Sequence, residues 1–390
     1  MIAPVVPCSN LAWPNSPSSE SLPPKSRFAI ELANEADDAE LRGLLRRSSI
    51  PGSISVTFER EPSFFDSCGV RGDFFQVGIG RDLRTGSVIG LGTRSVSSAF
   101  VNGRPMPLGY LADLRLDERY RGGTLIARGY RFLRQLHEDH GARLYTTMIF
   151  SGNHAALTTI ASGRAGLPQY HDMGLVDSPG INIRRAKPPI HAGCEILRGS
   201  QELLPEIVEC LNRNNSRRQF APVHTVAMFQ TQWRDFSITD FYVAVRGSRV
   251  IGVLGCWDQS GFKQTRLAGY GRRLRYLVPL ANILRPITGA PLFPKPGQEV
   301  TYFYISFIAV DEDDVQIFRA LLRGAYNDAV GSRYLYAILA LHERDSLLPV
   351  LRDYSLTPFS GRLFCVTFED GEDMYRSLDG RVPYLEAATF

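Results

Sequence analysis

The 390-residue chain lacks several features that would place it in a functional class at once. No apolar run approaches the roughly 20 residues that a membrane-spanning helix needs. A net charge of +4 spread over the whole length gives no basic patch for nucleic acid. The cysteines form no CxxC pair, which argues against a zinc site and a disulfide framework. They are Cys8, Cys68, Cys194, Cys210, Cys256 and Cys365. We therefore expect a cytoplasmic protein with reduced cysteines, no metal, and neither membrane nor nucleic acid as a partner.

The first 26 residues also lack something, namely the basic start and continuous apolar core of a signal peptide. Six prolines and many serines occupy this stretch instead, a composition that cannot build a packed core. We expect residues 1–26 to form a disordered or loosely packed tail.

From Arg27 onward, strand-like and helix-like segments alternate, which predicts an α/β or α+β fold. Asp73–Ile79 and Ser87–Thr93 flank a turn ending at Gly86 and predict a β-hairpin. A long amphipathic helix is predicted over Thr124–Asp139, with its buried face marked by three apolar residues. These are Leu125, Phe132 and Leu136.

The second half repeats this order of elements. Tyr302–Val310 reads as a strand and is followed by a helical segment from Asp314 to Asp328. Leu116-Asp117 matches Val310-Asp311 when the halves are laid side by side. Two copies of one unit explain the length well. We expect domains over residues 27–190 and 191–390.

One segment of the first unit carries chemistry. Between Tyr110 and Arg128 a strand ends, a short turn holds Arg121 and two glycines, and a helix begins at once. The backbone N–H groups at a helix N-terminus are unpaired and carry partial positive charge, so the turn suits an anion such as a pyrophosphate. Arg121 and Arg128 would add charge. The Rossmann and Walker A motifs are both absent, which leaves neither nucleotide-binding loop as an explanation.

The pattern Leu114-x-Leu116-x-x-x-Tyr120-Arg121-Gly122-Gly123 resembles the signature of the GNAT (Gcn5-related N-acetyltransferase) superfamily. The order of hairpin, signature strand, long helix and strand is similar as well. This resemblance implies two tandem GNAT-like units over residues 27–390, each with a mixed, mostly antiparallel central sheet flanked by helices. It also implies a transferase that moves an acetyl group from acetyl-CoA to a small-molecule amine.

The resemblance further implies which residues bind coenzyme A. The strand Leu114-Arg115-Leu116 would hydrogen-bond the pantetheine arm through its backbone, and an amide there would polarise the thioester carbonyl. Asn153 occupies a position where the family places a cofactor contact. The pyrophosphate would meet the amides of the turn and the helix start, which are Arg121, Gly122, Gly123, Thr124, Leu125 and Ile126.

The chain departs from the family pattern at two kinds of position. Thr124 and Ile126 stand where the family loop has small residues. Ile160 stands where the family has the tyrosine that protonates the leaving thiolate. Tyr170 and His171 follow shortly after and are the alternative acids, although each also has a structural interpretation.

A general base would remove a proton from an ammonium substrate. Asp113 on the signature strand is the local candidate, and the alternative is an ion pair with Arg115, which strand alternation places on the same face. Glu59 and Glu61 precede the hairpin and line either the acceptor pocket or a solvated loop.

The second unit is expected to lack a CoA site, because four consecutive acidic residues, Asp311 to Asp314, replace the arginine and glycines of the loop. They would repel phosphates and instead suit the start of a helix. This unit either shapes the acceptor site or forms a homodimer surface. The basic and apolar insertion Lys263–Gln298 either binds an acidic or lipid-like acceptor or packs on the sheet. The segment Tyr384–Phe390 reads as a closing strand.

Three functional hypotheses follow from these residues. The leading one is direct acyl transfer from CoA to an amine in a ternary complex, with acetyl as the default group. The second is an inactive protein that binds CoA or another partner. The third is an acyltransferase for long acyl chains.

Overall fold

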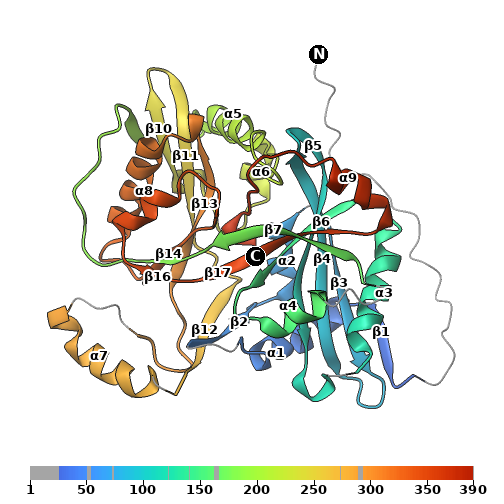
Figure 1. Cartoon of the computed structure of the whole chain (residues 1–390). Helices are drawn as coiled ribbons and strands as arrows, with labels where there is room; N and C mark the ends of the chain where they lie inside the picture. Colours follow the sequence, from blue (N-terminus) through green and yellow to red (C-terminus); the bar gives the residue numbers. More distant parts are fainter. Residues whose placement is uncertain are drawn as a thin grey trace.

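The computed structural model describes residues 26–50, 54–72, 74–121, 123–139, 141–161, 167–272, 274–288 and 293–389, and the statements below concern these residues. The expected tail over residues 1–26 lies outside them except for Ser26. Two large sheets lie side by side with helices against their faces (Figure 1), which confirms the predicted fold class of mixed sheets flanked by helices. None of the described helices is long and apolar enough to cross a membrane.

The first sheet has eight described strands, all paired antiparallel except β5 and β6. The predicted hairpin is confirmed as β3 and β4, and Gly86 in its turn has a φ of 76°. In spatial order the strands are β1 (Phe28–Leu32), β3 (Phe74–Asp82), β4 (Val88–Val101), β5 (Arg104–Leu116), β6 (Leu144–Phe150), β17 (Ser360–Thr367), β7 (Gln169–Asp177) and β15 (Leu341–His342).

The second sheet has seven described strands, and the predicted strand Tyr302–Val310 is confirmed as β13. The strand β14 beside it is short, since only three residues of it pair. In spatial order the strands are β16 (Leu356–Thr357), β8 (Gly180–Asn182), β14 (Tyr336–Ile338), β13 (Tyr302–Val310), β11 (Arg249–Trp257), β10 (Phe241–Arg246) and β9 (Glu195–Arg198).

The helices cover both faces of the first sheet. Leu41, Leu44 and Leu45 of α1 are fully buried against one face, and α3 lies against the other. The described helices are α1 (Asp38–Arg47), α2 (Phe64–Cys68), α3 (Leu125–His137), α4 (His154–Ala161), α5 (Leu204–Asn215), α6 (Val226–Thr231), α7 (Leu274–Thr288), α8 (Val315–Ala329) and α9 (Glu372–Arg376).

The two halves of the chain exchange strands. The late strand β17 lies between β6 and β7 of the first sheet, and the early strand β8 pairs with β14 in the second. A further two-stranded sheet pairs β2 (Ile54–Glu59) with β12 (Gln264–Tyr270) from the insertion. The expected domain boundary at residue 190 therefore does not separate the two sheets, because each sheet is completed by the other half.

The central strands of the two sheets carry the same irregularity. In β5 the register against β4 shifts between Leu91 and Thr93, and Asp113 there has a φ of 54°. In β13 the register against β11 shifts in the same way, and Phe307 has a φ of 55°. Such a β-bulge holds one extra residue and bends its strand. Asp113 and Phe307 lie at equal distances from the matched pair Leu116 and Val310, which supports the internal repeat.

The predicted closing strand at residues 384–390 is wrong for the part that the structure describes. Ala387–Thr389 form a 3₁₀ turn instead. The segment is held by side chains rather than by a ladder, because Glu386 accepts a hydrogen bond from the backbone N–H of Phe307 at 2.8 Å. Lys263 Nζ also donates to the carbonyl of Ala388 at 2.8 Å.

Candidate functional site

A cavity of about 260 Å³ lies in the first sheet where β5 and β6 part. The two strands pair only at Gly109–Tyr145 and Tyr110–Thr146, and beyond these pairs they diverge. Leu111–Leu116 and Thr147–Phe150 then line the two sides of the opening. Strand edges that part in this way leave backbone N–H and C=O groups for an extended ligand. The cavity thus offers a ladder position that no strand of the described chain fills.

The pair Gly109–Tyr145, close to the opening, is held by the buried ring of Tyr145. The Tyr145 ring lies so close over Gly109 that a Cβ there would come within 2.0 Å of it. The Tyr145 hydroxyl accepts a hydrogen bond from Arg94 Nε at 3.2 Å and bonds His137 Nδ1 at 2.9 Å. Arg94 in turn binds both carboxylate oxygens of Asp139 at 2.7 Å. This network fixes the wall of the cavity at the point where the strands part.

The bulge of β5 is clamped by buried charges. Asp113 forms an ion pair with Arg71, and its second oxygen lies 3.5 Å from Arg60. All three side chains are at least nine-tenths buried. Burial acts to raise the pKa of Asp113, but the charges of Arg71 and Arg60 outweigh it and hold that pKa well below its ordinary value. Asp113 is therefore an ionised anchor for the bulge.

These contacts correct two expectations about Asp113. The register pairs Ala112 with Thr93 and Arg115 with Leu91, so the extra residue shifts the alternation, and Arg115 no longer shares a face with Leu111. Asp113 pairs with Arg71 and Arg60 rather than with Arg115. A carboxylate with a lowered pKa accepts a proton poorly, so this environment disfavours the predicted role of general base.

The same basic cluster ties the last described residues to the bulge. Arg71 Nε donates to the carbonyl of Thr389 at 3.1 Å, beside the contact of Lys263 with Ala388. Burial lowers the pKa of Lys263, and the nearby charges of Arg60 and Arg71 lower it further. The cluster at Asp113 of β5 therefore joins Arg60 and Arg71 from the first half, Lys263 from the insertion, and the last described residues of the chain.

The helix next to the cavity begins without a side-chain cap. Thr124 is the N-cap of α3 but makes no capping hydrogen bond, and the first turn has no acidic residue. Leu125 and Ile126 line the cavity. Arg121 is exposed and only 3.3 Å from the exposed Glu118, so its guanidinium remains accessible to a ligand. Gly122 lies outside the described residues. The structure thus brings Leu114–Leu116 and the first two residues of α3, Leu125 and Ile126, to one cavity, while Arg121, Gly123 and Thr124 are not among the residues that line it.

Arg128 does not serve the loop as expected. Its guanidinium donates to Ser26 Oγ at 2.7 Å and to the carbonyl of Phe28 at 2.6 Å. These bonds tie α3 to β1, so the positive charge that faces solvent at the loop comes from Arg121.

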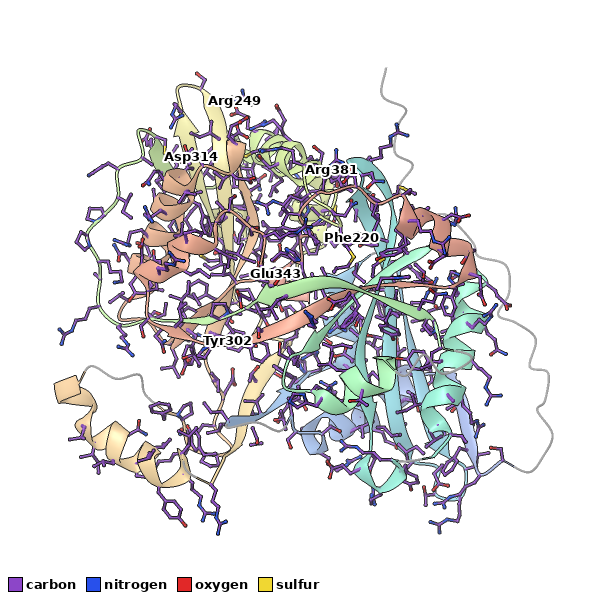
Figure 2. The ribbon with its side chains drawn as sticks, viewed as in Figure 1. Phe220, Arg249, Tyr302, Asp314, Glu343 and Arg381 are labelled. Carbon is purple, nitrogen blue, oxygen red and sulfur yellow. The ribbon has the colours of Figure 1, made fainter. Side chains whose placement is uncertain are left out.

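The equivalent helix start in the second unit is closed. Asp314 caps α8 by accepting from the backbone N–H groups of Gln316 at 2.8 Å and Ile317 at 3.3 Å. Figure 2 shows Asp314 at this end of the second unit, near Arg249. Asp311 and Asp313 of the turn bind arginines, as in Arg213–Asp311 at 3.0 Å and Arg218–Asp313 at 2.8 Å. The acidic turn therefore caps a helix and forms ion pairs, the structural role expected for it.

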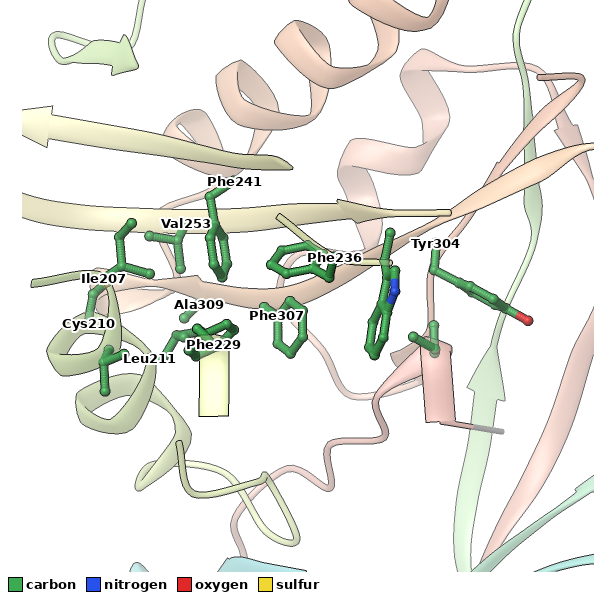
Figure 3. Packing of buried hydrophobic residues seen from close by; sticks show 14 of the residues in the cluster. Ile207, Cys210, Leu211, Phe229, Phe236, Phe241, Val253, Tyr304, Phe307 and Ala309 are labelled. Atoms are coloured by element: carbon green, nitrogen blue, oxygen red, sulfur yellow. The ribbon is translucent and has the colours of Figure 1, made fainter. Parts of the chain in front are cut away.

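The bulge residue of the second unit, Phe307, is packed in the protein core. The Phe307 ring packs among other buried aromatic rings, with the Trp257 ring stacked 5.7 Å away (Figure 3). The rings around it are those of His224, Phe229, Trp233, Phe236, Phe241 and Trp257. The bulge residue of the first unit is an ion-paired carboxylate, and that of the second unit is a ring in an aromatic core.

Two tyrosines meet at the wall of the first cavity. The hydroxyls of Tyr170 and Tyr130 lie 2.7 Å apart, and both residues line the cavity. Burial raises the pKa of Tyr170 well above its ordinary value, and Tyr130 adds to this, so the phenol keeps its proton at neutral pH. His171 lies elsewhere, stacked 3.6 Å from the Tyr375 ring. The side chain of Ile160 is outside the described residues.

The remaining predicted residues have structural contacts. Asn153 lines the cavity, but its Oδ1 accepts from the N–H of Ala156 at 3.2 Å and so caps α4. Glu59 pairs with Arg266 at 3.2 Å, and Glu61 pairs with Arg42. Neither glutamate is among the residues that line the cavity, so the structure does not bring them to the candidate site.

Sequence reasoning missed the floor of the cavity. Two pairs of glycines oppose each other directly across β3 and β4, and all four line the cavity on the face covered by α3. They are Gly78 opposite Gly92 and Gly80 opposite Gly90. In both strands these glycines alternate with other residues, and this spacing can be read in the sequence. Two adjacent strands without side chains on one face leave a groove. The clamp residues Arg60 and Arg71 gave no comparable signal.

No family model and no curated protein matches the sequence. Solved structures do match. An N-myristoyltransferase of Saccharomyces cerevisiae with bound myristoyl-CoA aligns over 94% of this chain and 87% of its own, at 11% identity and a TM-score of 0.62. A GCN5-related N-acetyltransferase of Sphaerobacter thermophilus aligns over 88% and 96%, at 11% identity and a TM-score of 0.53.

A third structure is the GCN5-related glucosamine N-acetyltransferase region of a fungal multi-domain β-N-acetylglucosaminidase. It matches 87% of this chain and 38% of its own, with 14% identity and a TM-score of 0.56. At such identities these likenesses establish the fold, and the chain has the GNAT-like fold that the signature residues predicted.

The clamp on the bulge gives a testable prediction. Replacing Asp113 by Asn leaves Arg71 and Arg60 buried without their carboxylate and should lower the free energy of unfolding by about 3–5 kcal/mol. Because the pKa of Asp113 is lowered on folding, its contribution is present above the unfolded pKa of about 3.9 and is lost as the pH falls through the lower folded value. Urea unfolding should show a constant difference between wild type and variant from about pH 5 to 8.

The exposed pair Glu118–Arg121 provides the control, since Glu118→Gln should change stability by less than about 1 kcal/mol. An Asp113→Asn protein as stable as wild type at pH 7 would contradict the clamp.

Proposed function

We propose that this protein is an N-acyltransferase that moves an acyl group from a coenzyme A thioester to a small-molecule amine. The observation that carries this proposal is the joining of two features at one cavity. The diverging strands β5 and β6 offer a free ladder edge, and the uncapped start of α3 adjoins it. An extended pantetheine arm with an anionic pyrophosphate at its end matches that pair of features.

The backbone would do most of the binding. The amides from Arg121 to Ile126 would bind the pyrophosphate, and the exposed Arg121 would add a charge-assisted contact. Leu114–Leu116 would pair with the pantetheine arm along the parted edge of β5. The bulge takes Asp113 and Leu114 out of register with β4, and a backbone N–H there would stabilise the oxyanion that develops on the thioester carbonyl.

Asp113 is then a positioning residue rather than the general base, since its ion pairs fix the bulge that aims those amides. Tyr170 remains the proposed acid. Its phenol is protonated and lies at the cavity wall, so it would donate a hydrogen bond to the departing sulfur. The C–N bond would form as the C–S bond breaks, and the leaving thiolate, hydrogen-bonded by Tyr170, would take up the proton that the amine loses. The pKa of a free thiol, about 8.5, lies below that of the buried phenol, so Tyr170 would act as a hydrogen-bond donor and keep its proton.

A second candidate concerns the acyl group. The glycine pairs of β3 and β4 clear a groove under α3 that is walled by apolar side chains, including Phe132, Leu133 and Leu136. The pantetheine arm would take up the part of the cavity beside Leu114–Leu116, and the groove under α3 extends the cavity beyond it to the glycines of β3. This observation favours an acyl chain longer than acetyl.

The CoA site is tested by calorimetry with coenzyme A. Replacing Arg121 by Glu puts a negative charge at the loop and should weaken binding by roughly 10- to 100-fold. Arg104→Glu is the matched control, because Arg104 is exposed at the opposite end of β5 and should leave the affinity unchanged. A wild-type protein that does not bind CoA, or an Arg121→Glu protein that binds equally well, would refute the site.

The acid is tested by turnover. Free thiol release over a panel of amines should show that Tyr170→Phe lowers kcat on the order of 10²-fold with little change in CoA affinity. Tyr375→Phe is the control, since Tyr375 stacks on His171 away from the cavity. Full activity in Tyr170→Phe would remove it from the mechanism. Tight CoA binding without turnover of any amine would favour the inactive CoA-binding alternative.

The acyl group is tested with thioesters of two, eight and fourteen carbons. Gly78→Leu fills the groove beside Phe132, so the ratio of long-chain to acetyl transfer should fall by at least about tenfold, because the chain loses burial worth about 0.8 kcal/mol per CH₂. Gly78→Ala adds one methyl at ordinary contact distance and serves as the graded control. An unchanged ratio would place the chain elsewhere.

A further inference from the structure

The strongest feature outside the cavity is the helix α7, which projects from the molecule beyond β12 (Figure 1). Four large apolar side chains are more than half exposed on it, at spacings that place them on one helical face. They are Tyr276 (69% exposed), Leu277 (57%), Leu280 (54%) and Ile283 (73%). We call these four residues the α7 stripe.

The opposite side of α7 is attached to the protein. Val278 is buried, and Asn282 exchanges two hydrogen bonds of 2.9 Å with the backbone of Phe293. The helix is therefore held in place on one side, and the stripe faces away from the contacts that hold it. Exposed apolar residues gathered on one face of a helix mark an interaction surface.

The charge around the stripe has one sign. Between Asp258 and Glu299 the sequence contains no acidic residue. Apart from the buried Lys263 and from Arg266, which pairs with Glu59 and Glu299, its basic residues are Arg272, Arg273, Arg275, Arg285 and Lys295. Arg275 lies at the border of the stripe, 5.1 Å from the Tyr276 ring centre, and donates to the Tyr276 hydroxyl at 3.0 Å. A cation is thus held where the apolar face meets water.

We propose that α7 docks on an anionic lipid surface, with the stripe entering the headgroup region and the arginines contacting the lipid phosphates. A helix with an apolar face, basic flanks and an aromatic residue at the border has the composition of interfacial helices. A second copy of the chain would bring two positively charged helices together, which like-charge repulsion disfavours. The surface lies outside the acyltransferase cavity, so the inference stands independently of the proposed function.

The test is co-sedimentation of the full-length protein with vesicles of phosphatidylcholine alone or mixed with phosphatidylglycerol. We expect binding to the mixed vesicles that weakens as salt is raised, and at least tenfold weaker binding to the neutral ones. The double variant Leu280→Glu/Ile283→Glu should lose binding to the mixed vesicles. Arg272→Glu/Arg275→Glu should weaken it by at least tenfold, since each basic residue near such a surface contributes about 1 kcal/mol.

Leu83→Glu is the matched control, because Leu83 is also 58% exposed but lies in the β3–β4 turn. It should bind like wild type, and all variants should melt at the wild-type temperature, since the replaced side chains face solvent. No vesicle binding by the wild type, or equal binding by the Leu280→Glu/Ile283→Glu protein, would overturn the proposal. Self-association abolished by the same variant, without vesicle binding, would assign the stripe to a dimer instead.

Discussion

The ion pair between Asp113 and Arg71 is the interaction on which the candidate site depends. It holds a strand residue at a φ of 54°, a region that costs a side chain other than glycine free energy and is kept only where surrounding contacts enforce it. Through this bend β5 leaves β6 after two paired residues, and the opening for a ligand follows. The same guanidinium holds the carbonyl of Thr389, so the geometry of the first sheet and the path of the final residues are set together.

The second unit shows the same bulge with an aromatic residue in the place of Asp113. Phe307 adopts nearly the same φ as Asp113, but its ring enters an aromatic core and its N–H is bound by Glu386. Asp314 occupies the helix amides that would face a phosphate. A single framework therefore carries an ion-paired bulge and an uncapped helix start in one copy, and an aromatic bulge and a capped helix start in the other. The difference lies in side chains at three equivalent places: the bulge, the turn and the helix start.

The sequence predicted most of what depends on local pattern. The hairpin β3–β4, the strand β13 and the helices α3 and α8 follow from periodicity and turn residues, and the signature around Arg121 located the loop. The strand exchange was not predictable, because β17 looks like any short apolar strand and its neighbours lie about 200 residues away in the chain. The partners of Asp113 were missed for a similar reason: strand alternation fails at a bulge, and Arg71 reaches it from a different segment.

The position of β17 has a consequence for the synthesis of the chain. Until the ribosome has added the residues from Ser360 onward, β6 and β7 lack β17, the strand that lies between them in the finished sheet. Each of the two strands then exposes an unpaired edge. A nascent chain that ends just before Ser360 therefore already contains every described strand of the second sheet, while the first sheet still lacks β17 between β6 and β7. The first sheet begins earlier in the chain but is completed later than the second.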